Sequence, residues 1–237
     1  QRISLTVLGF GRGNVKDSKM ELLADKGNGN YAYIDTIQEA RKVLVRELGA
    51  TLTTIAKDVK LQIEFNPAKV RAYRLIGYEN RLLRAEDFHD DAKDAGEIGA
   101  GHSVTALYEL VPAGSDQALP QVDPLKYQTL AMSASASASP EALTLKLRYK
   151  EPDGETSRLL TQPVLDESVP LAAASETLRF AAAVAELGLL LRESPHKGRA
   201  NYEQVAEMAS QALGGDPDGD RAGFLQLVHT ARRLGPE

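Results

Sequence analysis

The sequence predicts the end of a doubly wound α/β sheet, then an antiparallel β-sandwich-like domain, then a C-terminal helical bundle. Strands alternate with helices over residues 1–57, period-two strands fill residues 58–165, and helical periodicity covers residues 166–237. We take these three ranges as the expected domains. With 237 residues and 43% hydrophobic content, the chain is long enough to bury a core.

The chain opens on an apolar run at residues 3–8, which is typical of a parallel strand covered on both faces. Asp17 is placed to cap a short helix that ends at Gly27, and residues 30–35 form a second strand. A central parallel strand needs a neighbour on each side. We therefore expect the chain to be a fragment that begins inside a domain.

Thr36 and Glu39 have the spacing of a capping box, in which each side chain satisfies an unpaired amide at the start of a helix. Apolar residues at spacings of three and four predict that this helix continues through Gly49. They are Ile37, Ala40, Leu44, Leu48, Leu52 and Ile55.

From Val59 the pattern changes to strict alternation of apolar and polar residues, which indicates a strand with one dry face. Similar patterns occur at residues 70–78, 103–111 and 143–149. The Pro152-Asp153-Gly154 turn predicts that residues 157–161 pair back as a hairpin. An antiparallel sandwich or partial barrel is the natural arrangement of such strands.

Two segments interrupt the β-rich range. Residues 84–101 are acidic and rich in glycine, and residues 132–140 contain a near-repeat of serine and alanine. We expect both to be irregular, the second as a surface linker, because it has no large side chain to anchor it.

Beyond about Leu171 the sequence is helical, with three amphipathic segments that would cover an open sheet face. Asn201 is placed to cap the second segment and Asp220 the third, which ends before Gly235. Each apolar stripe is expected to be core rather than a cofactor site.

Composition excludes several classes of protein. A net charge of −5 and a pI near 5.5 argue against a nucleic-acid partner, which would require a basic surface. The absence of cysteine excludes disulfides, thiolate zinc sites and a cysteine nucleophile. No apolar run approaches the roughly 18 residues that a transmembrane helix needs, so we expect no membrane-spanning segment.

The glycine-rich loop from Gly9 to Gly13 invites comparison with the dinucleotide-binding fingerprint, in which tight glycine turns bring the backbone close to a pyrophosphate. The spacing differs, because one residue rather than two precedes the third glycine. We favour an ordinary strand-to-helix loop and expect no cofactor-binding residue.

A dense group of metal-ligating residue types lies at Asp87, Asp90, Asp91 and Asp94. Clustered carboxylates can bind a hard cation, although most acidic loops are simply solvated. The neighbouring candidates are Glu86, His89, Glu97 and His102. The run from Asp216 to Asp220 resembles a calcium loop but lacks the required glycine and glutamate, so helix capping explains it better.

Nothing in the sequence pairs a nucleophile with a base. The histidines His89, His102, His196 and His229 lie outside any Gly-x-Ser-x-Gly or His-Glu-x-x-His motif. We therefore expect no catalytic residue and no enzymatic activity.

Two stretches, residues 5–11 and 20–31, resemble the last third of a von Willebrand factor type A domain. The resemblance is closest to a bacterial family of surface or envelope proteins in which this domain precedes a specific C-terminal region of unknown function. Further stretches are similar to that region: residues 65–67, 73–81, 94–102, 148–150 and 179–185.

The resemblance implies a doubly wound domain with a metal-ion-dependent adhesion site, at which Mg²⁺ or Ca²⁺ is held for a partner's carboxylate. That site is built from an Asp-x-Ser-x-Ser loop, a Thr and an Asp, all upstream of this chain. No Asp-x-Ser-x-Ser motif occurs here, so none of those ligands can be assigned to any position. The resemblance also implies a bacterial envelope or periplasmic location.

These observations together predict a non-catalytic protein-interaction or adhesion module with a protein partner of unknown identity. Because unpaired strand edges recruit other strands, we expect a homo-oligomer or association with the missing N-terminal segment. The alternatives are a nucleotide-binding α/β enzyme fragment that uses the Gly9 to Gly13 loop, and a purely structural envelope component.

Overall fold

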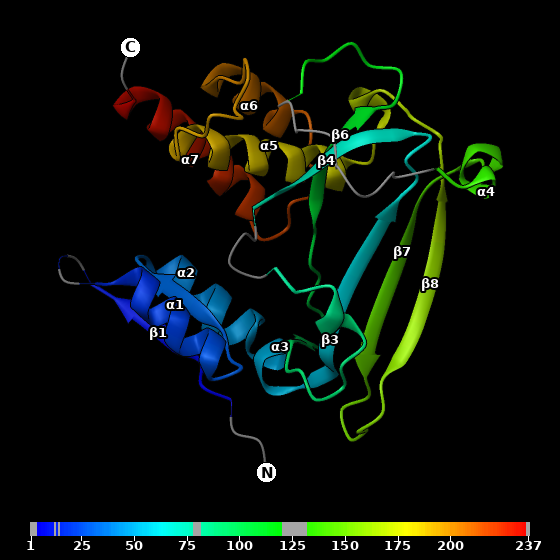
Figure 1. The fold of residues 1–237 in the computed structure, drawn as a ribbon. Coiled ribbons are helices and arrows are strands. Elements are labelled where there is room, and N and C mark those ends of the chain that lie inside the picture. Colours follow the sequence, from blue (N-terminus) through cyan, green and yellow to red (C-terminus); the bar gives the residue numbers. More distant parts are fainter. Residues whose placement is uncertain (1–3, 12, 14, 78–81, 120–131, 236–237) are drawn as a thin grey trace. The chain divides into compact units, whose positions relative to one another are not determined.

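The computed structural model describes residues 4–11, 13, 15–77, 82–119 and 132–235 (Figure 1). The chain forms two compact units. The first contains Gln1–Asn66, Leu82–Val104 and Glu141–Val164, and the second contains Pro67–Arg81, Thr105–Pro140 and Leu165–Glu237. These units do not follow the three consecutive ranges expected from the sequence, because the chain crosses several times from one unit to the other.

The first unit begins with a parallel βαβ element. Strand β1 (Val7–Phe10) pairs with β2 (Tyr31–Ile34), and α1 (Asp17–Lys26) connects them. The predicted end of α1 is confirmed, since the Gly27 N–H donates to the Leu23 carbonyl at 3.0 Å. The predicted capping role of Asp17 is wrong. Lys16 occupies the N-cap without a side-chain hydrogen bond, and Asp17 is the first helical residue.

The second helical segment begins as predicted, because the Thr36 hydroxyl accepts a hydrogen bond from the Glu39 N–H at 3.1 Å. It is not one continuous α-helix. Helix α2 (Ile37–Arg41) passes into a π-helical turn, η1 (Lys42–Arg46), and then into α3 (Leu48–Leu52). The predicted continuation to Ile55 is wrong, because that residue already lies in strand β3 (Thr54–Phe65).

Strand β3 belongs to a four-stranded sheet with the order β5-β3-β7-β8. The other strands are β5 (Gly96–Gly99), β7 (Glu141–Lys150) and β8 (Arg158–Leu165). Strands β7 and β8 form the expected hairpin, while β3 begins earlier than expected. Strand β5 lies in the acidic segment that we expected to be irregular, so that expectation is wrong for these residues.

The second unit contains an antiparallel pair, β4 (Val70–Ile76) with β6 (Leu107–Pro112), and a short helix, α4 (Ala134–Ala138). Helix α4 lies in the serine-alanine segment, which is not wholly irregular as expected. Because the two antiparallel sheets belong to different units, a β-sandwich stays a prediction.

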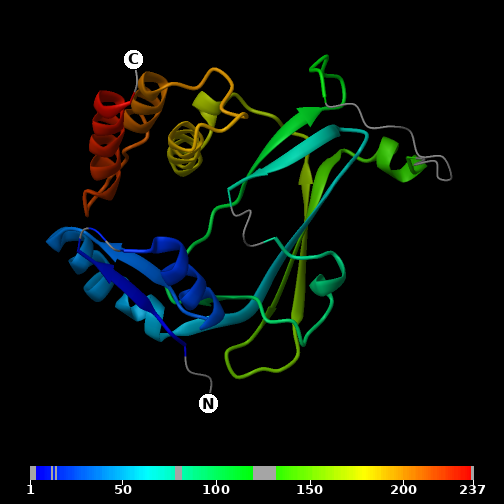
Figure 2. The ribbon, with the colours of Figure 1, turned by 60° about the vertical axis from the view of Figure 1, so that its left-hand side comes forward.

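The rest of the second unit is helical, with a short turn η4 (Leu171–Ala173) followed by three helices (Figures 1 and 2). They are α5 (Glu176–Leu191), α6 (Tyr202–Ser210) and α7 (Asp220–Leu234). All three contribute buried side chains to one core cluster: Ala183, Leu187, Leu190, Val205, Ala206, Ala209 and Val228. In the part of the chain that the structure describes, no helix has the length and apolar character needed to cross a membrane.

The caps of the last two helices differ in how well they were predicted. Asn201 caps α6 as expected, accepting a hydrogen bond from the Gln204 N–H at 3.0 Å. Asp220 does not cap α7. The carboxylate of Asp216 accepts hydrogen bonds from the N–H groups of Arg221 and Ala222 at 3.1 and 2.9 Å. These hydrogen bonds, first of all that from Ala222, lower the pKa of Asp216.

Candidate functional site

The acidic segment of residues 86–97 forms an ordered loop against the four-stranded sheet. It contains a short 3₁₀ turn, η3 (Glu86–Phe88), and leads into β5. The Phe88 side chain is 2% exposed and its ring meets the His89 ring edge-on, with centroids 5.1 Å apart. The buried ring of Phe88 therefore anchors the loop, although most residues next to Phe88 in the sequence are charged.

Cationic side chains from β3 and β7 hold the loop. Lys60 and Arg148 are direct partners in the β3–β7 register, and Lys150 lies two residues beyond Arg148 on the same face. The Lys60 ammonium donates to the carbonyl of Asp87 at 3.1 Å and also to that of Asp90. Lys60 and Lys150 are each only 4% exposed, so the loop shields both from solvent.

The other two cations converge on Asp91. The Lys150 Nζ atom lies 2.7 Å from the Asp91 carbonyl oxygen, and Arg148 Nη2 lies 3.2 Å from Oδ1 of Asp91. The Ser157 hydroxyl, just before β8, donates to the same Oδ1 atom. The hydrogen bond from Ser157, with further help from Arg148, lowers the pKa of Asp91. This carboxylate is therefore fixed by the chain itself.

Asp58 is a buried carboxylate at an irregular point of β3. The β3 register shifts against both β5 and β7 around this residue, and Asp58 adopts a φ of 50°, in the left-handed region that non-glycine residues seldom occupy. Its side chain accepts hydrogen bonds from Lys150 Nζ at 2.7 Å and from the Ala95 N–H at 3.3 Å. The bulge thus turns an acidic side chain inward to meet a buried lysine.

The electrostatics of this pair favour the ionised forms. Burial works against ionisation of Asp58, but the hydrogen bond from Lys150 and the N–H of Ala95 outweigh it and lower the pKa of the carboxyl. The hydrogen bond to Asp58 raises the pKa of Lys150 against the opposing effect of burial. Both groups are charged at neutral pH.

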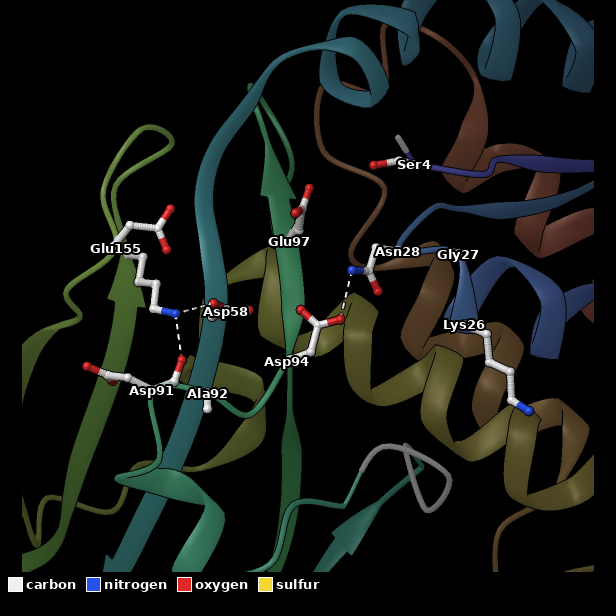
Figure 3. Close-up of a pocket in the computed structure, with 11 residues that line it drawn as sticks. Ser4, Lys26, Gly27, Asn28, Asp58, Asp91, Ala92, Asp94, Glu97 and Glu155 are labelled. Carbon is white, nitrogen blue, oxygen red and sulfur yellow. Dashed lines mark hydrogen bonds and ion pairs between the residues drawn. The ribbon is translucent and has the colours of Figure 1, made fainter. Parts of the chain in front are cut away.

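A hollow of about 540 Å³ lies beside this pair, within the first unit (Figure 3). Carboxylates outnumber ammonium groups five to two in its lining. Figure 3 shows Asp58 between Asp91 and Asp94, with the Asn28 amide turned toward Asp94. The lining residues are Ser4, Lys26, Gly27, Asn28, Asp58, Asp91, Ala92, Asp94, Glu97, Lys150 and Glu155.

The four carboxylates proposed as a cation cluster do not converge. Asp91 and Asp94 line the hollow, whereas Asp87 pairs with Lys93 at 3.5 Å and Asp90 accepts a hydrogen bond from the Ala92 N–H. Asp94 accepts a hydrogen bond from Asn28 Nδ2 at 2.8 Å. Among the described residues there is no group of three or more His, Asp or Glu side chains that could hold a metal ion.

The histidines lie in different settings. His89 contacts Phe88 at the loop and lies 3.5 Å from Arg148 Nη1, while His102 follows β5. His196 and His229 belong to the helical part of the second unit, and His229 is in α7. The hollow can attract a cationic group, and its described lining presents no pairing of a nucleophile with a histidine base.

The glycine loop after β1 is open. Gly11 and Gly13 have φ values of 87° and 111°, and a Cβ at either position would meet nothing within 4 Å. Residues 12 and 14 lie outside the described residues. Helix α1 begins only at Asp17, so its N-terminus is not joined directly to the loop as in the dinucleotide fingerprint.

Sequence reasoning missed Asp58, Lys60 and Lys150, the most buried charged residues that the structure describes. Lys60 and Lys150 fall at the polar positions of alternating strands, which predicted a solvated face. That prediction is wrong for these two residues, because the acidic loop covers them. No sequence signal identified Asp58, because its inward orientation comes from the bulge in β3.

Comparison with known proteins gives a family match. The family model described as "Uncharacterized protein YfbK, C-terminal" matches residues 50–234. Uncharacterized protein YfbK of Escherichia coli (strain K12) is 44% identical over 229 residues, which cover 97% of this chain and 39% of that protein. This chain therefore spans well under half the length of that relative.

One solved structure also matches. It is the crystal structure of the ArnB paralog VWA2 from Sulfolobus acidocaldarius, with a TM-score of 0.39 and 12% identity. The match covers 98% of this chain and 51% of the other. Agreement at this level carries no argument about site or function.

Proposed function

The chain belongs to the family of the YfbK C-terminal region, and from that premise we propose that it is a non-catalytic protein-interaction module. The module would bind polypeptide through the βαβ element at β1 and β2. The family resemblance to a von Willebrand factor type A domain supports this proposal, and adhesion by the longer protein and an envelope location remain predictions.

The observation that carries the proposal is the incomplete burial of the βαβ element. A parallel sheet is normally covered on both faces and contains more than two strands. Here β1 and β2 form a two-stranded parallel sheet, and Phe10 at the end of β1 is 59% exposed. Leu22 and Leu23 of α1 are 53% and 55% exposed.

The following helices add to this apolar surface. Val45 and Leu52 are 69% and 74% exposed, and Ile37 is 74% exposed. Large exposed apolar patches mark sites of association, and we propose that these side chains form such a patch. We propose that further α/β polypeptide of the longer protein packs here, and that this polypeptide, rather than the present chain, supplies any Mg²⁺ or Ca²⁺ site.

The test is hydrogen exchange and light scattering on the whole chain over a range of concentrations. Amides of β1 and β2 should exchange faster than those of β3 and β7 in dilute solution, and should become protected as the chain associates. F10D should weaken this association, whereas L227D, at a 64% exposed position in α7, should not.

β1 amides as well protected as those of β3 in dilute solution would contradict the proposal, because the βαβ element would then need no partner. So would equal effects of the F10D and L227D substitutions, because the βαβ surface would then have no special role.

A further inference from the structure

The turn between α1 and β2 carries the pair Asn28-Gly29. An asparagine followed by glycine deamidates easily, because glycine has no Cβ to obstruct attack by its own backbone nitrogen. In that reaction the Gly29 nitrogen loses its proton and bonds to Cγ of Asn28, and the side-chain nitrogen leaves as ammonia. Water then opens the resulting succinimide ring to aspartate or isoaspartate, so the amide becomes a carboxylate.

The fold requires both residues of this pair. The Gly29 N–H donates to the Ala24 carbonyl at 2.9 Å, and the Asn28 N–H donates to the next carbonyl of α1, that of Asp25, at 3.3 Å. Together they form a Schellman motif, in which Asn28 has a φ of 50°, a left-handed conformation that asparagine adopts more readily than most residues. A Cβ at Gly29 would lie 2.1 Å from the Leu5 carbonyl oxygen. The packing of this turn therefore retains a chemically labile pair.

Two hydrogen bonds of the closed turn oppose the reaction. The nitrogen that would attack is the donor to Ala24, and it must leave that carbonyl before it can reach Cγ of Asn28. The side-chain amide is held from outside the turn, because Asn28 Nδ2 donates to Asp94 Oδ2 at 2.8 Å (Figure 3). Asp94 belongs to the acidic loop, 66 residues further along the chain. A distant carboxylate thus helps to fix the labile amide.

We propose that Asn28 is a deamidation site, which the Schellman motif and Asp94 protect while the turn is closed and which reacts when the turn opens. The product carboxylate has no proton to donate at neutral pH, so it meets the Asp94 carboxylate as a like charge. Isoaspartate also lengthens the backbone before Gly29, where the turn packs closely against Leu5. Because the ammonia is lost, the turn stays separated from the acidic loop.

The first test follows deamidation by peptide mapping of the whole chain, kept dilute in mildly alkaline buffer. Trypsin cleaves after Lys26 and Arg41, so one peptide of residues 27–41 contains both Asn28 and Asn30. Asn30 precedes a tyrosine and is the more exposed of the two, which makes it an internal control. In urea Asn28 should react faster than Asn30 by about tenfold or more, because glycine leaves the attack unobstructed. In the folded chain the reaction of Asn28 should be slower, in proportion to the time that the turn is open.

Two substitutions in the acidic loop separate protection by Asp94 from general loosening of the loop. D94A removes the acceptor of the Asn28 amide and should raise the deamidation rate in the folded chain about fivefold, the effect of losing one partly exposed hydrogen bond. D90A removes the acceptor of the Ala92 N–H within the loop itself and should leave the rate at the wild-type value. Equal rates in D94A and the wild type, or equal acceleration by both substitutions, would overturn the proposal.

The second test supplies the aspartate product directly. In N28D, hydrogen exchange at residues 27–30 and 94–97 should be faster than in the wild type, because two carboxylates then face each other. The double variant N28D/D94N again places an amide opposite a carboxylate, with donor and acceptor exchanged, and should recover slow exchange. Recovery cannot follow from misfolding of N28D. Unchanged exchange in N28D, or no recovery in the double variant, would overturn the proposal.

These results do not depend on association through β1 and β2. Asn28 and Asn30 are compared within one peptide of the dilute chain, and F10D, which should weaken that association, should deamidate at the wild-type rate. An Asn28 that reacts no faster than Asn30 in urea would remove the chemical basis of the proposal. An Asn28 that reacts as fast in the folded chain as in urea would overturn it as well, because the closed turn would then give no protection.

Discussion

Lys150 Nζ and Asp58 Oδ2 lie 2.7 Å apart on adjacent strands, and their side chains are 6% and 5% exposed. The pair joins the bulge of β3 to the last residue of β7. Its Lys150 member also reaches the Asp91 carbonyl, so the same ammonium holds the acidic loop.

We expect K150M to lower the free energy of unfolding by about 3 kcal/mol, because it leaves the carboxylate of Asp58 buried without its cation. The double variant D58N/K150M should lose less than K150M alone, since the uncompensated charge is also removed. Asparagine suits this comparison because it tolerates the left-handed conformation. Urea unfolding measures both, and a K150M variant as stable as the wild type would contradict the expectation.

The pair also predicts how stability depends on pH. The pKa of Asp58 is lowered in the folded chain, so its contribution is complete above the ordinary aspartate pKa and is lost as pH falls through the lowered value. The pKa of Lys150 is raised, so its contribution is complete below the ordinary lysine pKa and is lost as pH rises through the raised value. Melting curves across pH should therefore show weaker losses at both extremes in D58N/K150M than in the wild type.

Two glycines of β5 should respond differently to alanine. A Cβ at Gly99 would lie 1.7 Å from the Ala50 carbonyl oxygen of α3, which is a clash with backbone. At Gly96 a Cβ would meet nothing within 4 Å. We expect G99A to cost about 3 kcal/mol and G96A to change the free energy of unfolding by less than about 0.5 kcal/mol. Equal chemical denaturation midpoints for the two variants would show that α3 does not pack on β5 in this way.

Phe88 should prove necessary for the ordered state of the acidic loop. F88A removes a side chain that is 2% exposed, and we expect a loss of about 3 kcal/mol. Hydrogen exchange of residues 86–97 should accelerate together with this loss. L82A, at a position 70% exposed, should leave both the exchange and the unfolding free energy close to wild type.

The sequence predicted those elements whose signals are local. Strand β2, the cap at Thr36 and the cap at Asn201 each depend on residues close together in the chain. Strand β1 was predicted at residues 3–8 but is Val7–Phe10, so its position was predicted only in part. The hairpin of β7 and β8 likewise follows from alternation and turn residues. These signals gave the parallel pair of β1 and β2 ahead of the antiparallel strands.

The missed features depend on distant partners. Strand β5 reads Gly-Glu-Ile-Gly, which has no strand pattern, and it is extended because it pairs with β3. The π-helical turn η1 adds a residue to one helical turn, so the apolar stripe through Leu44 and Leu48 is no longer aligned, and both side chains remain partly exposed.

For the candidate site, the sequence predicted only the location. Sequence reasoning singled out the acidic segment but could not tell whether solvent, a metal ion or the protein itself neutralises it. The answer depends on the register that brings Lys60 beside Arg148, and on the bulge that aims Asp58 at Lys150.

The positive charges that neutralise the acidic loop are therefore carried by side chains of the same polypeptide. Lys60, Arg148 and Lys150 donate hydrogen bonds to carbonyl and carboxylate oxygens of the loop, which are the kind of ligand that a calcium ion binds. We therefore expect this loop to fold without a divalent ion from the medium. Its conformation should consequently be the same in compartments whose free calcium concentrations differ by orders of magnitude.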